Sequence, residues 1–361
     1  MCRDRIQNFK NMIYSKVRLH QFTQDVFIQC GMPASDAALA ADVLLSADLR
    51  GIDSHGVARL NGYVRLYEAG RANMHAHHKI IHQTPSTATI DADNGLGLVV
   101  APKAMELAME KAKQVGTGWV AIQNSNHFGI AAYHAMKALP HDMIGISMTN
   151  ASPLVAPTHS KERMLGTNPI CIAFPSGQEL PFVIDMATSN AANGKLEIAQ
   201  RLNKELPNGW VQTKDGSPSI NANELKNGGA LLPLGGHKGY GLGAAVDILS
   251  AVLSGANYGP WVPPFVAFLN PLENLPGNGI GHFLGAMRID AFRPAADFKL
   301  HMDNWITRFK QAQRIDSNQE IFIPGEIEFN TNKDRELNGI PLNEVVEKDL
   351  QELAQKLGLN L

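Results

Sequence analysis

The spacing of apolar residues divides the chain into a helical first part, a middle part rich in short strands, and a helical end. In the first part and near the C-terminus, apolar side chains recur every three or four residues, which is the period of an amphipathic helix. The pattern predicts helices over residues 17–31, 35–49, 101–114, 243–253, 294–311 and 342–357. The period changes at Thr87, where short apolar runs bounded by turn residues begin.

These short runs predict strands over residues 87–91, 119–123, 144–149, 169–174, 182–186 and 281–289, with a further strand end at 321–324. Closely spaced short strands favour antiparallel or mixed pairing over regular repeats of strand and helix. We expect a loose polar arm over residues 1–13 and loops over residues 210–218 and 258–281. The second loop is long enough to suggest a functional role.

The segment RGIDSHGVARLNGY, residues 50–63, follows the helix predicted to end at Leu49. Gly51 fits the left-handed residue that commonly closes such a helix. We expect a new helix to begin near Ser54 and run to about residue 70, with the side chain of Asp53 or Ser54 as its N-cap.

A helix in this position places His55, Arg59 and Tyr63 on one face. Its apolar residues, Val57, Leu60 and Val64, lie on another face that can dock on a core. Arginine grips a carboxylate through two parallel hydrogen bonds, and histidine carries protons near neutral pH. The arrangement therefore predicts a clamp for a small organic acid. The alternative is a solvated helix face with an ordinary i,i+4 pair.

His127 lies where a strand, WVAIQ, passes through the turn NSNHFG into a helix, IAAYHAMKAL. Free backbone N–H groups at the start of a helix favour anions. The small polar neighbours Asn124, Ser125 and Asn126 leave room for a ligand and supply hydrogen bonds. We therefore expect His127 in a binding site, although it could instead cap the helix or pack in the turn.

The amino-acid composition narrows the possible classes of protein. A chain of 361 residues suggests two domains or lobes, and 44% hydrophobic with 18% charged residues is ordinary for a globular protein. The net charge of −2 without a basic run suggests neither nucleic acid nor a membrane surface as partner. The three scattered cysteines fit a reducing compartment. No signal-peptide core or membrane-spanning stretch is evident, so we expect a cytoplasmic protein.

Other possible sites are weaker. The sequence Gly95-Leu96-Gly97 lacks the third glycine of a dinucleotide fingerprint, and Lys238 stands in a glycine-rich run without the Walker spacing. The histidines of residues 74–78, with His82 beyond, could bind a metal. No carboxylate or cysteine stands beside them at ligand spacing, so we expect a solvated loop and predict no metal site.

Seven pieces of the sequence together resemble the malate/L-lactate dehydrogenase family that is unrelated to the Rossmann-type enzymes. They are RGIDSHGVAR, NSNHFG, GTNP, DMATS, GHKGYGL, GHFLGAMRIDAF and PGE. The resemblance covers residues ~15–360 and extends to ureidoglycolate, sulfolactate and diketogulonate dehydrogenases. It implies an α/β (α+β) fold with a nicotinamide-binding domain on a mixed, largely antiparallel sheet, over 81–311. It also implies a mainly helical substrate and dimerisation domain, over 1–80 and 312–361, and a homodimer with its active site in a cleft near the interface.

The resemblance also implies roles for particular residues. His127 corresponds to the family's proposed proton acceptor and to a cofactor contact, and His55 with Arg59 corresponds to its substrate-gripping pair. In some relatives the first of these two residues is the acid/base, so the choice between His55 and His127 stays open. The substrate set is Ser54, His55, Arg59, Tyr63 and Thr167. The other cofactor contacts are Ser152, Asp185, Met186, Ala187, Lys238, Gly325 and Glu326. Ala151 stands where close relatives carry a serine.

The implied reaction is the oxidation of a small 2-hydroxy acid to the 2-oxo acid by NAD or NADP, with NAD slightly favoured. Malate is the first expectation for the substrate. Lactate, sulfolactate, ureidoglycolate and the reduction of a cyclic imine are alternatives within the family. Two other classes are considered: a metal-dependent hydrolase built on the histidines, and a non-catalytic binding protein that uses the Arg59 clamp.

Overall fold

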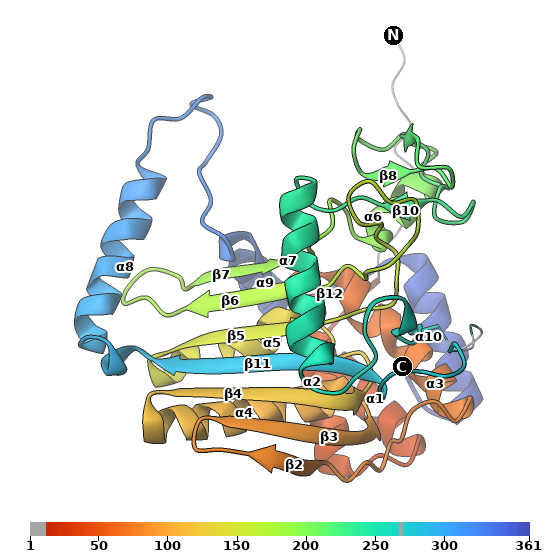
Figure 1. Ribbon diagram of the computed structural model, residues 1–361, viewed down its shortest axis with the longest axis horizontal. Coiled ribbons are helices and arrows are strands. Elements are labelled where there is room, and N and C mark those ends of the chain that lie inside the picture. The colour runs from red at the N-terminus through yellow and green to blue at the C-terminus, as the bar shows by residue number, and fades with distance from the viewer. Residues whose placement is uncertain (1–11, 267–268, 270) are drawn as a thin grey trace.

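A seven-stranded mixed sheet forms the centre of the molecule, with helices on both of its faces (Figure 1). The computed structural model describes residues 12–266, 269 and 271–361. The strand order is β2-β3-β4-β11-β5-β6-β7. The strands are Lys79–Gln83 (β2), Thr87–Gly95 (β3), Thr117–Ser125 (β4), Met143–Thr149 (β5), Ile170–Phe174 (β6), Phe182–Met186 (β7) and Ile280–Arg288 (β11). Strands β3 and β4 are parallel and the other neighbouring pairs are antiparallel, which confirms the predicted mixed sheet.

Each face of the sheet buries a different set of apolar side chains. Helices α4 (Gly97–Val115) and α5 (Ala131–Met136) pack on one face through a core rich in alanine and methionine. Helix α7 (His237–Asp247) and the π-helical turn η4 (Ile248–Val252) cover part of the other face, where Val246 packs near Ile146 and Met148. The alternation of side chains along each strand supplies both faces.

The two ends of the chain share one core. Helices α1 (Lys16–Gln29), α2 (Ala34–Leu49), α3 (Leu60–Glu68) and α10 (Glu344–Leu357) contribute its side chains. Strand β1 (Met12–Tyr14) pairs with β12 (Ile340–Leu342), which follows helix α9 (Glu326–Asn338). This shared core supports the division of the chain into 1–80 with 312–361 and 81–311, which we keep as a proposal.

A small sheet that the sequence analysis missed lies above the large one in Figure 1. Its strands are β8 (Val211–Gln212), β9 (Pro218–Ser219) and β10 (Ala230–Leu231), and they share a core with helix α6 (Asn193–Arg201). The prediction of a loop over 210–218 was therefore wrong. Strands of two residues are too short to show an alternating pattern.

The helix predicted from Ser54 to about residue 70 is confirmed in its second part, by α3, but its first part was wrong. The chain instead forms two 3₁₀ turns, η1 (Asp53–His55) and η2 (Val57–Arg59), before α3 begins at Leu60, and neither turn has a side-chain N-cap. Gly56 separates the turns with a ψ of −143°, outside the helical range. The predicted left-handed Gly51 is confirmed by its φ of 76°.

Other predicted helix and strand boundaries differ from those in the structure. Residues 321–324 do not form a strand, and only the carbonyl of Pro324 pairs with β7, through the N–H of Val183. Helix α7 begins six residues earlier than predicted, because tertiary packing offsets the low helix propensity of its glycines. Of the expected polar arm, residues 1–11 lie outside the described residues, whereas Met12–Tyr14 forms a strand. In the loop over 258–281, residues 267, 268 and 270 also lie outside them.

Helix α8 (Ala295–Lys310) and the segment after it project from the sheet as an arm (Figure 1).

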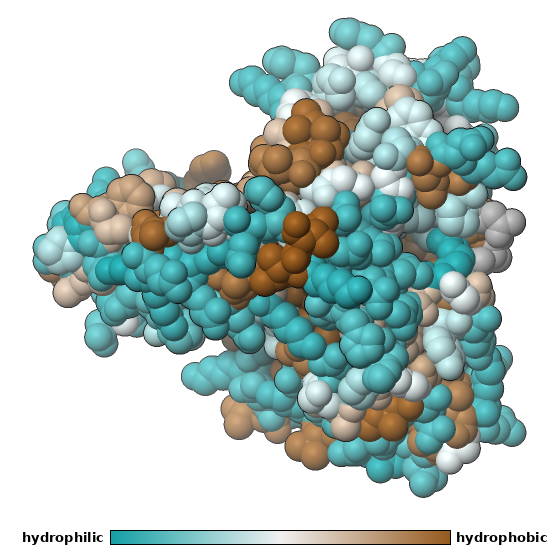
Figure 2. Space-filling view, turned by 60° about the horizontal axis from the view of Figure 1, so that its bottom comes forward, coloured by the Kyte–Doolittle hydropathy of each residue, from teal (hydrophilic) through white to brown (hydrophobic). Residues whose placement is uncertain are grey.

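The surface is largely hydrophilic, but Figure 2 shows several patches where apolar side chains gather. Large exposed apolar side chains on α7 and η4 include Leu242, Ile248 and Val252. In the part of the chain that the structure describes, no helix is long and apolar enough to cross a membrane.

Candidate active site

His55 and His127 lie side by side, although they come from distant parts of the chain. Their ring centroids are 5.8 Å apart, and the ring planes make an angle of 27°. His55 ends the turn η1, and His127 lies in the turn between β4 and α5. The fold therefore brings together the two imidazoles that the sequence analysis selected independently.

Tyr63 joins this pair through the ring nitrogen Nδ1 of His127. Its phenolic oxygen lies 2.6 Å from Nδ1 of His127, and the N–H of Gly129 donates to the same nitrogen over 3.3 Å. Tyr63 is fully buried, which raises the pKa of its phenol and keeps it neutral. In one tautomer of His127, Nδ1 accepts hydrogen bonds from the phenol and from the N–H of Gly129. In the other tautomer, Nδ1–H donates to the phenol oxygen, the bond from Gly129 is lost, and Nε2 can accept a proton.

Burial sets the protonation of both histidines. It lowers the pKa of His127 well below 6.5, and the neighbouring His55 and Arg59 lower it further. Burial and Arg59 also lower the pKa of His55, to about 4. Both imidazoles are therefore neutral near pH 7, the state in which an imidazole can accept a proton.

The Nε of Arg59 is bound within the protein, whereas its two Nη groups can bind a ligand. Its Nε donates to the carbonyl of Ser54 over 2.7 Å, which folds the guanidinium back over the turn η1. Within the described residues, neither of its Nη groups has a hydrogen-bond partner. The Ser54 hydroxyl lies 2.9 Å from Nδ1 of His55 and so orients that ring. These contacts leave a guanidinium able to accept a carboxylate beside two neutral imidazoles.

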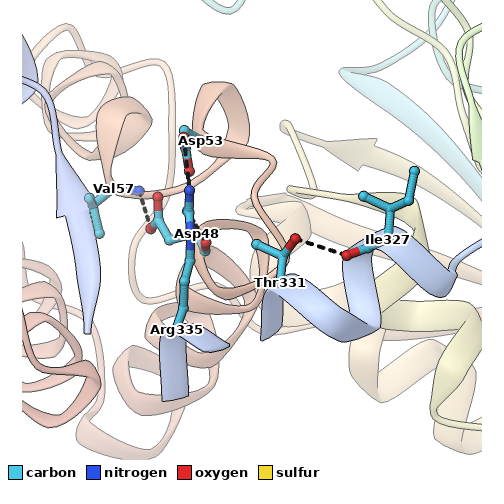
Figure 3. A network of polar contacts seen from close by, with 6 residues as sticks. All are labelled: Asp48, Asp53, Val57, Ile327, Thr331 and Arg335. Carbon is cyan, nitrogen blue, oxygen red and sulfur yellow. Dashed lines mark hydrogen bonds and ion pairs between the residues drawn. The ribbon is translucent and has the colours of Figure 1, made fainter. Parts of the chain in front are cut away.

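The turns that carry His55 and Arg59 rest on a buried carboxylate (Figure 3). Asp48, at 1% exposure, accepts the N–H of Val57 over 2.8 Å. A Cβ on Gly56 would lie 2.0 Å from the same carboxylate, so only glycine permits this approach. Arg335 of α9 ties the assembly together, since it donates to the carbonyl of Asp48 and pairs with Asp53.

The predicted cofactor segments meet around Asn168. Its side chain accepts the N–H of Ala151 over 3.1 Å and donates to the carbonyl of Gly243 over 3.0 Å. Thr188 donates its hydroxyl to the carbonyls of Asn168 and Thr167, 3.1 Å from each. The motifs GTNP and DMATS thus lie against α7, which carries Lys238, and against the segment before Ser152.

A second cluster lies behind β7. A cavity of about 290 Å³ is lined by Arg50, Asp185, Gly325, Glu328 and apolar side chains. The Asp185 carboxylate accepts the N–H of Ala132 over 2.8 Å, and burial raises its pKa to about 6. Arg50 is 4% exposed, and its Nε has no partner among the described residues. The cavity brings two predicted cofactor residues, Asp185 and Gly325, to one place.

The remaining predicted residues are spread more widely. Lys238 is exposed in the first turn of α7, and Glu326 is paired with Lys310. Met186 is paired with Ile170 in the sheet, and Ala187 follows β7 directly. Among the described residues, no hydrogen bond links Thr167, Ser152, Lys238 or Glu326 to either histidine.

Several residues of the site were not selected from the sequence. Asp48, Arg335 and Phe265, whose ring centroid lies 4.9 Å from that of His127, act through contacts between distant segments, which no local pattern records. Asn168 lies within the motif GTNP but was not singled out. A single signal existed for Asp48, because it is an acid within an apolar helix. The expected histidine loop over 74–78 is indeed a loop, and the described residues hold no group of three or more side chains suited to a metal ion.

Comparison with known proteins places this arrangement in a family. A family model of malate/L-lactate dehydrogenase matches residues 14–351. The chain is 44% identical to a malate dehydrogenase from Pyrococcus horikoshii over 95% of each chain. It is 41% identical to an L-sulfolactate dehydrogenase from Methanocaldococcus jannaschii, over 93% of this chain and 95% of that one. Solved structures of malate dehydrogenase and sulfolactate dehydrogenase from these organisms superpose with TM-scores of 0.87 and 0.89, both at 40% identity. The first covers 97% of each chain, and the second covers 97% of this chain and 98% of that one.

These findings define the class first: the protein is an oxidoreductase, a 2-hydroxy acid dehydrogenase with a fold other than the Rossmann fold. Within this class, the chain belongs to the malate/L-lactate dehydrogenase family. Membership implies a nicotinamide cofactor. The resemblance stated from the seven sequence pieces is therefore confirmed.

The buried carboxylate of Asp48 gives a testable pH dependence of stability. Burial raises its pKa from 3.8 to about 8, so the protonated native form contributes stability that is fully present below the unfolded pKa and is lost as pH rises through about 8. Asp48→Asn keeps an acceptor for Val57 but cannot titrate. We expect its free energy of unfolding to improve relative to wild type between pH 5 and pH 8, with a slope approaching about 1.4 kcal/mol per pH unit.

Denaturant unfolding at several pH values measures this slope. The matched control is Asp349→Asn, at an exposed position on α10, which should keep the wild-type dependence. Parallel stability curves for wild type and Asp48→Asn would contradict the assignment.

Proposed function

We propose that this dehydrogenase oxidises malate to oxaloacetate, with NAD as its cofactor. The observation that carries the proposal is the meeting of His55 and His127 beside a guanidinium, that of Arg59, whose Nη groups have no partner among the described residues. A carboxylate clamp next to a neutral base suits the oxidation of a 2-hydroxy acid. The name of the malate dehydrogenase relative at 44% identity supports malate as the substrate.

In the proposed mechanism, Arg59 binds the C1 carboxylate through its two Nη groups. His127 accepts the C2 hydroxyl proton at Nε2 while its Nδ1–H donates to Tyr63. The phenol proton of Tyr63 is then free to donate to the substrate. His55 holds the hydroxyl or the carboxylate from the other side. His127 is preferred over His55 as the base because its Nδ1 is held by the buried phenol of Tyr63.

The residues around β7 fit a nicotinamide cofactor. When bound, its ring accepts the hydride from C2 of the substrate. We propose that Ser152, Asp185, Met186, Ala187, Lys238, Gly325 and Glu326 hold it. Two observations support this: their segments gather around Asn168 and the cavity behind β7, and Gly325 there has a φ of 93° and stands so close to Val183 that a Cβ would lie 3.0 Å from its side chain.

NAD is preferred over NADP on electrostatic grounds. The cavity behind β7 is lined by two carboxylates, Asp185 and Glu328, and one guanidinium, Arg50. An additional phosphate dianion finds no excess of positive charge there. The buried free thiols of Cys30 and Cys171 support the cytoplasmic location that we also propose.

The second carboxylate of malate needs a cation besides Arg59. Arg163 donates to the carbonyls of Gly229 and Leu225, and Lys195 lies over the ring of Trp210. Because these two groups are engaged elsewhere, lactate is the second candidate substrate. Sulfolactate, ureidoglycolate and a cyclic imine remain to be compared in the same assay.

The deciding experiment follows cofactor absorbance with a panel of 2-hydroxy and 2-oxo acids and a cyclic imine, each with NAD and with NADP in the matching redox state. The proposal requires malate with NAD to give the highest kcat/KM. A higher value for lactate would select the second candidate. If no 2-hydroxy acid reduced either cofactor, the proposed function would be wrong.

Substitution of the two central residues should separate binding from proton transfer. We expect Arg59→Lys to raise KM by roughly 10- to 100-fold, because it removes a bidentate charge-assisted contact worth about 1.5–3 kcal/mol. His127→Asn should lower kcat by roughly 10²- to 10⁴-fold, the usual contribution of a positioned base. Steady-state kinetics of both variants measure this. Variants with wild-type kcat/KM would refute the roles.

The pH profile should reflect the low histidine pKa values. In the oxidation direction kcat/KM requires the neutral base and falls as that base becomes protonated. Since burial holds the pKa of His127 well below 6.5, we expect the acid limb to lie below pH 6.5 once the ionisation of the substrate is accounted for. A midpoint at or above pH 6.5 would contradict a neutral buried base.

A homodimer is also part of the proposal. The outward face of α7 and η4 exposes Leu242, Ile248, Val252 and, just beyond η4, Leu253, with exposed fractions of 37%, 54%, 52% and 59%. A row of large apolar side chains along one helix is typical of an interface. Helix α7 also carries the predicted cofactor residue Lys238 in its first turn, so a partner bound to this helix would lie near that residue.

Leu253→Glu should therefore convert the dimer into a monomer, because it places a charge in the proposed contact. Light scattering during size-exclusion chromatography measures the mass of each variant. Leu337→Glu is the matched control, since Leu337 is an exposed leucine on another helix, α9. A dimeric Leu253→Glu protein would exclude this face.

A further inference from the structure

One aromatic side chain outside all the motifs stands against the proposed substrate residues. The ring centroid of Phe265 is 4.9 Å from that of Tyr63 and 4.9 Å from that of His127. The guanidinium carbon of Arg59 lies 6.0 Å from the same centroid. A single apolar ring therefore borders the base, its phenol partner and the carboxylate clamp.

The backbone on both sides of Phe265 is fixed by one residue. Arg71 follows α3 and donates to the carbonyls of Pro264 and Val266 over 2.5 and 3.0 Å, and to that of Leu269 over 2.8 Å. Three bonds to backbone carbonyls do not depend on which side chains the loop carries. They set the position of the ring relative to α3, the helix that carries Tyr63.

Helix α3 also leaves space for the ring. A Cβ on Gly62 would lie 2.8 Å from Cε1 of Phe265. Any larger residue at position 62 would push the ring away from its present place. Gly62 leaves room for the ring of Phe265, and Arg71 holds its backbone, so the ring has a defined position at one side of the site.

We propose that Phe265 is a specificity-determining residue that limits the size of the C3 substituent of the 2-hydroxy acid and keeps water away from His127. This inference rests on the proposed function. With the carboxylate at Arg59 and the hydroxyl at His127, the substrate reaches both of its anchors along the face that Phe265 borders. A phenyl ring offers no hydrogen bond there, so bulk and shape decide which substituents fit.

The kinetic test compares a small acid with a bulky one, lactate and 2-hydroxy-4-methylpentanoate. We expect Phe265→Ala to raise the ratio of kcat/KM for the bulky acid to that for lactate by about tenfold or more, the usual size of such pocket effects. Phe265→Leu should give an intermediate ratio. The control is Phe292→Ala, which removes an exposed ring far along the chain and should keep the wild-type ratio. A ratio that stays at the wild-type value in Phe265→Ala would overturn the proposal.

A second readout does not require turnover. Diethylpyrocarbonate modifies neutral imidazoles, and mass spectrometry of peptides gives the rate at His127 itself. We expect Phe265→Ala to speed this reaction several-fold and Phe292→Ala to leave it unchanged. Arg71→Met, which keeps the ring but removes its backbone bonds, should fall between them. An unchanged rate at His127 in Phe265→Ala would refute the shielding part.

The two readouts also separate this inference from the proposed function. If the wild-type protein oxidised no 2-hydroxy acid, both the proposed function and the kinetic part of this inference would fail. The modification rate would still test whether Phe265 shields His127. If the wild type were active but the specificity ratio did not respond to Phe265, the inference alone would fail. Circular dichroism of each variant confirms folding, and Phe265→Leu replaces Phe265→Ala if the larger change unfolds the protein.

Discussion

The hydrogen bond between Tyr63 and His127 joins the two halves of this enzyme. Tyr63 lies on helix α3, in the core shared by both ends of the chain, and His127 lies in the turn after β4 of the central sheet. The phenol of Tyr63 is buried, so breaking the bond would leave it unsatisfied at a cost of about 1–3 kcal/mol. It therefore helps to fix the ring of His127 where the helical part and the sheet meet, at the proposed substrate site.

The arrangement of His55 and Arg59 depends on a second buried polar contact. Two short 3₁₀ turns have little stability of their own, because each makes few internal hydrogen bonds. The carboxylate of Asp48 stabilises the second turn by accepting the N–H of Val57, and Gly56 allows the backbone to approach that carboxylate. Since the carboxyl is held mostly neutral at pH 7, this support avoids most of the cost of a buried charge. The structure thus gains a defined site from turns that would not form alone.

Much of the fold was accessible from the sequence because the relevant signals are local. Short apolar runs predicted the strands and their mixed pairing, and the spacing of apolar residues located α1, α2 and α10. The first part of the helix expected from Ser54 was predicted wrongly because the contact of Gly56 with Asp48 joins separate elements, and no periodicity reports such a contact. The same reasoning explains why His55 and His127 could be selected by residue type and neighbours, whereas Phe265 and Arg71, which lie outside every motif, could not.

The charges in the site define the substrate more narrowly than the fold does. Both imidazoles are neutral near pH 7, so Arg59 supplies the positive charge beside them, which matches one carboxylate. Arg163 and Lys195 are engaged with backbone carbonyls and with Trp210, and they do not extend that charge to a second carboxylate. Recognition of the C1–C2 end is therefore the same for malate and lactate. In the proposed binding mode, discrimination between them occurs at C3, where the apolar ring of Phe265 borders the site, so the choice of substrate would depend on a loop residue and not on the clamp.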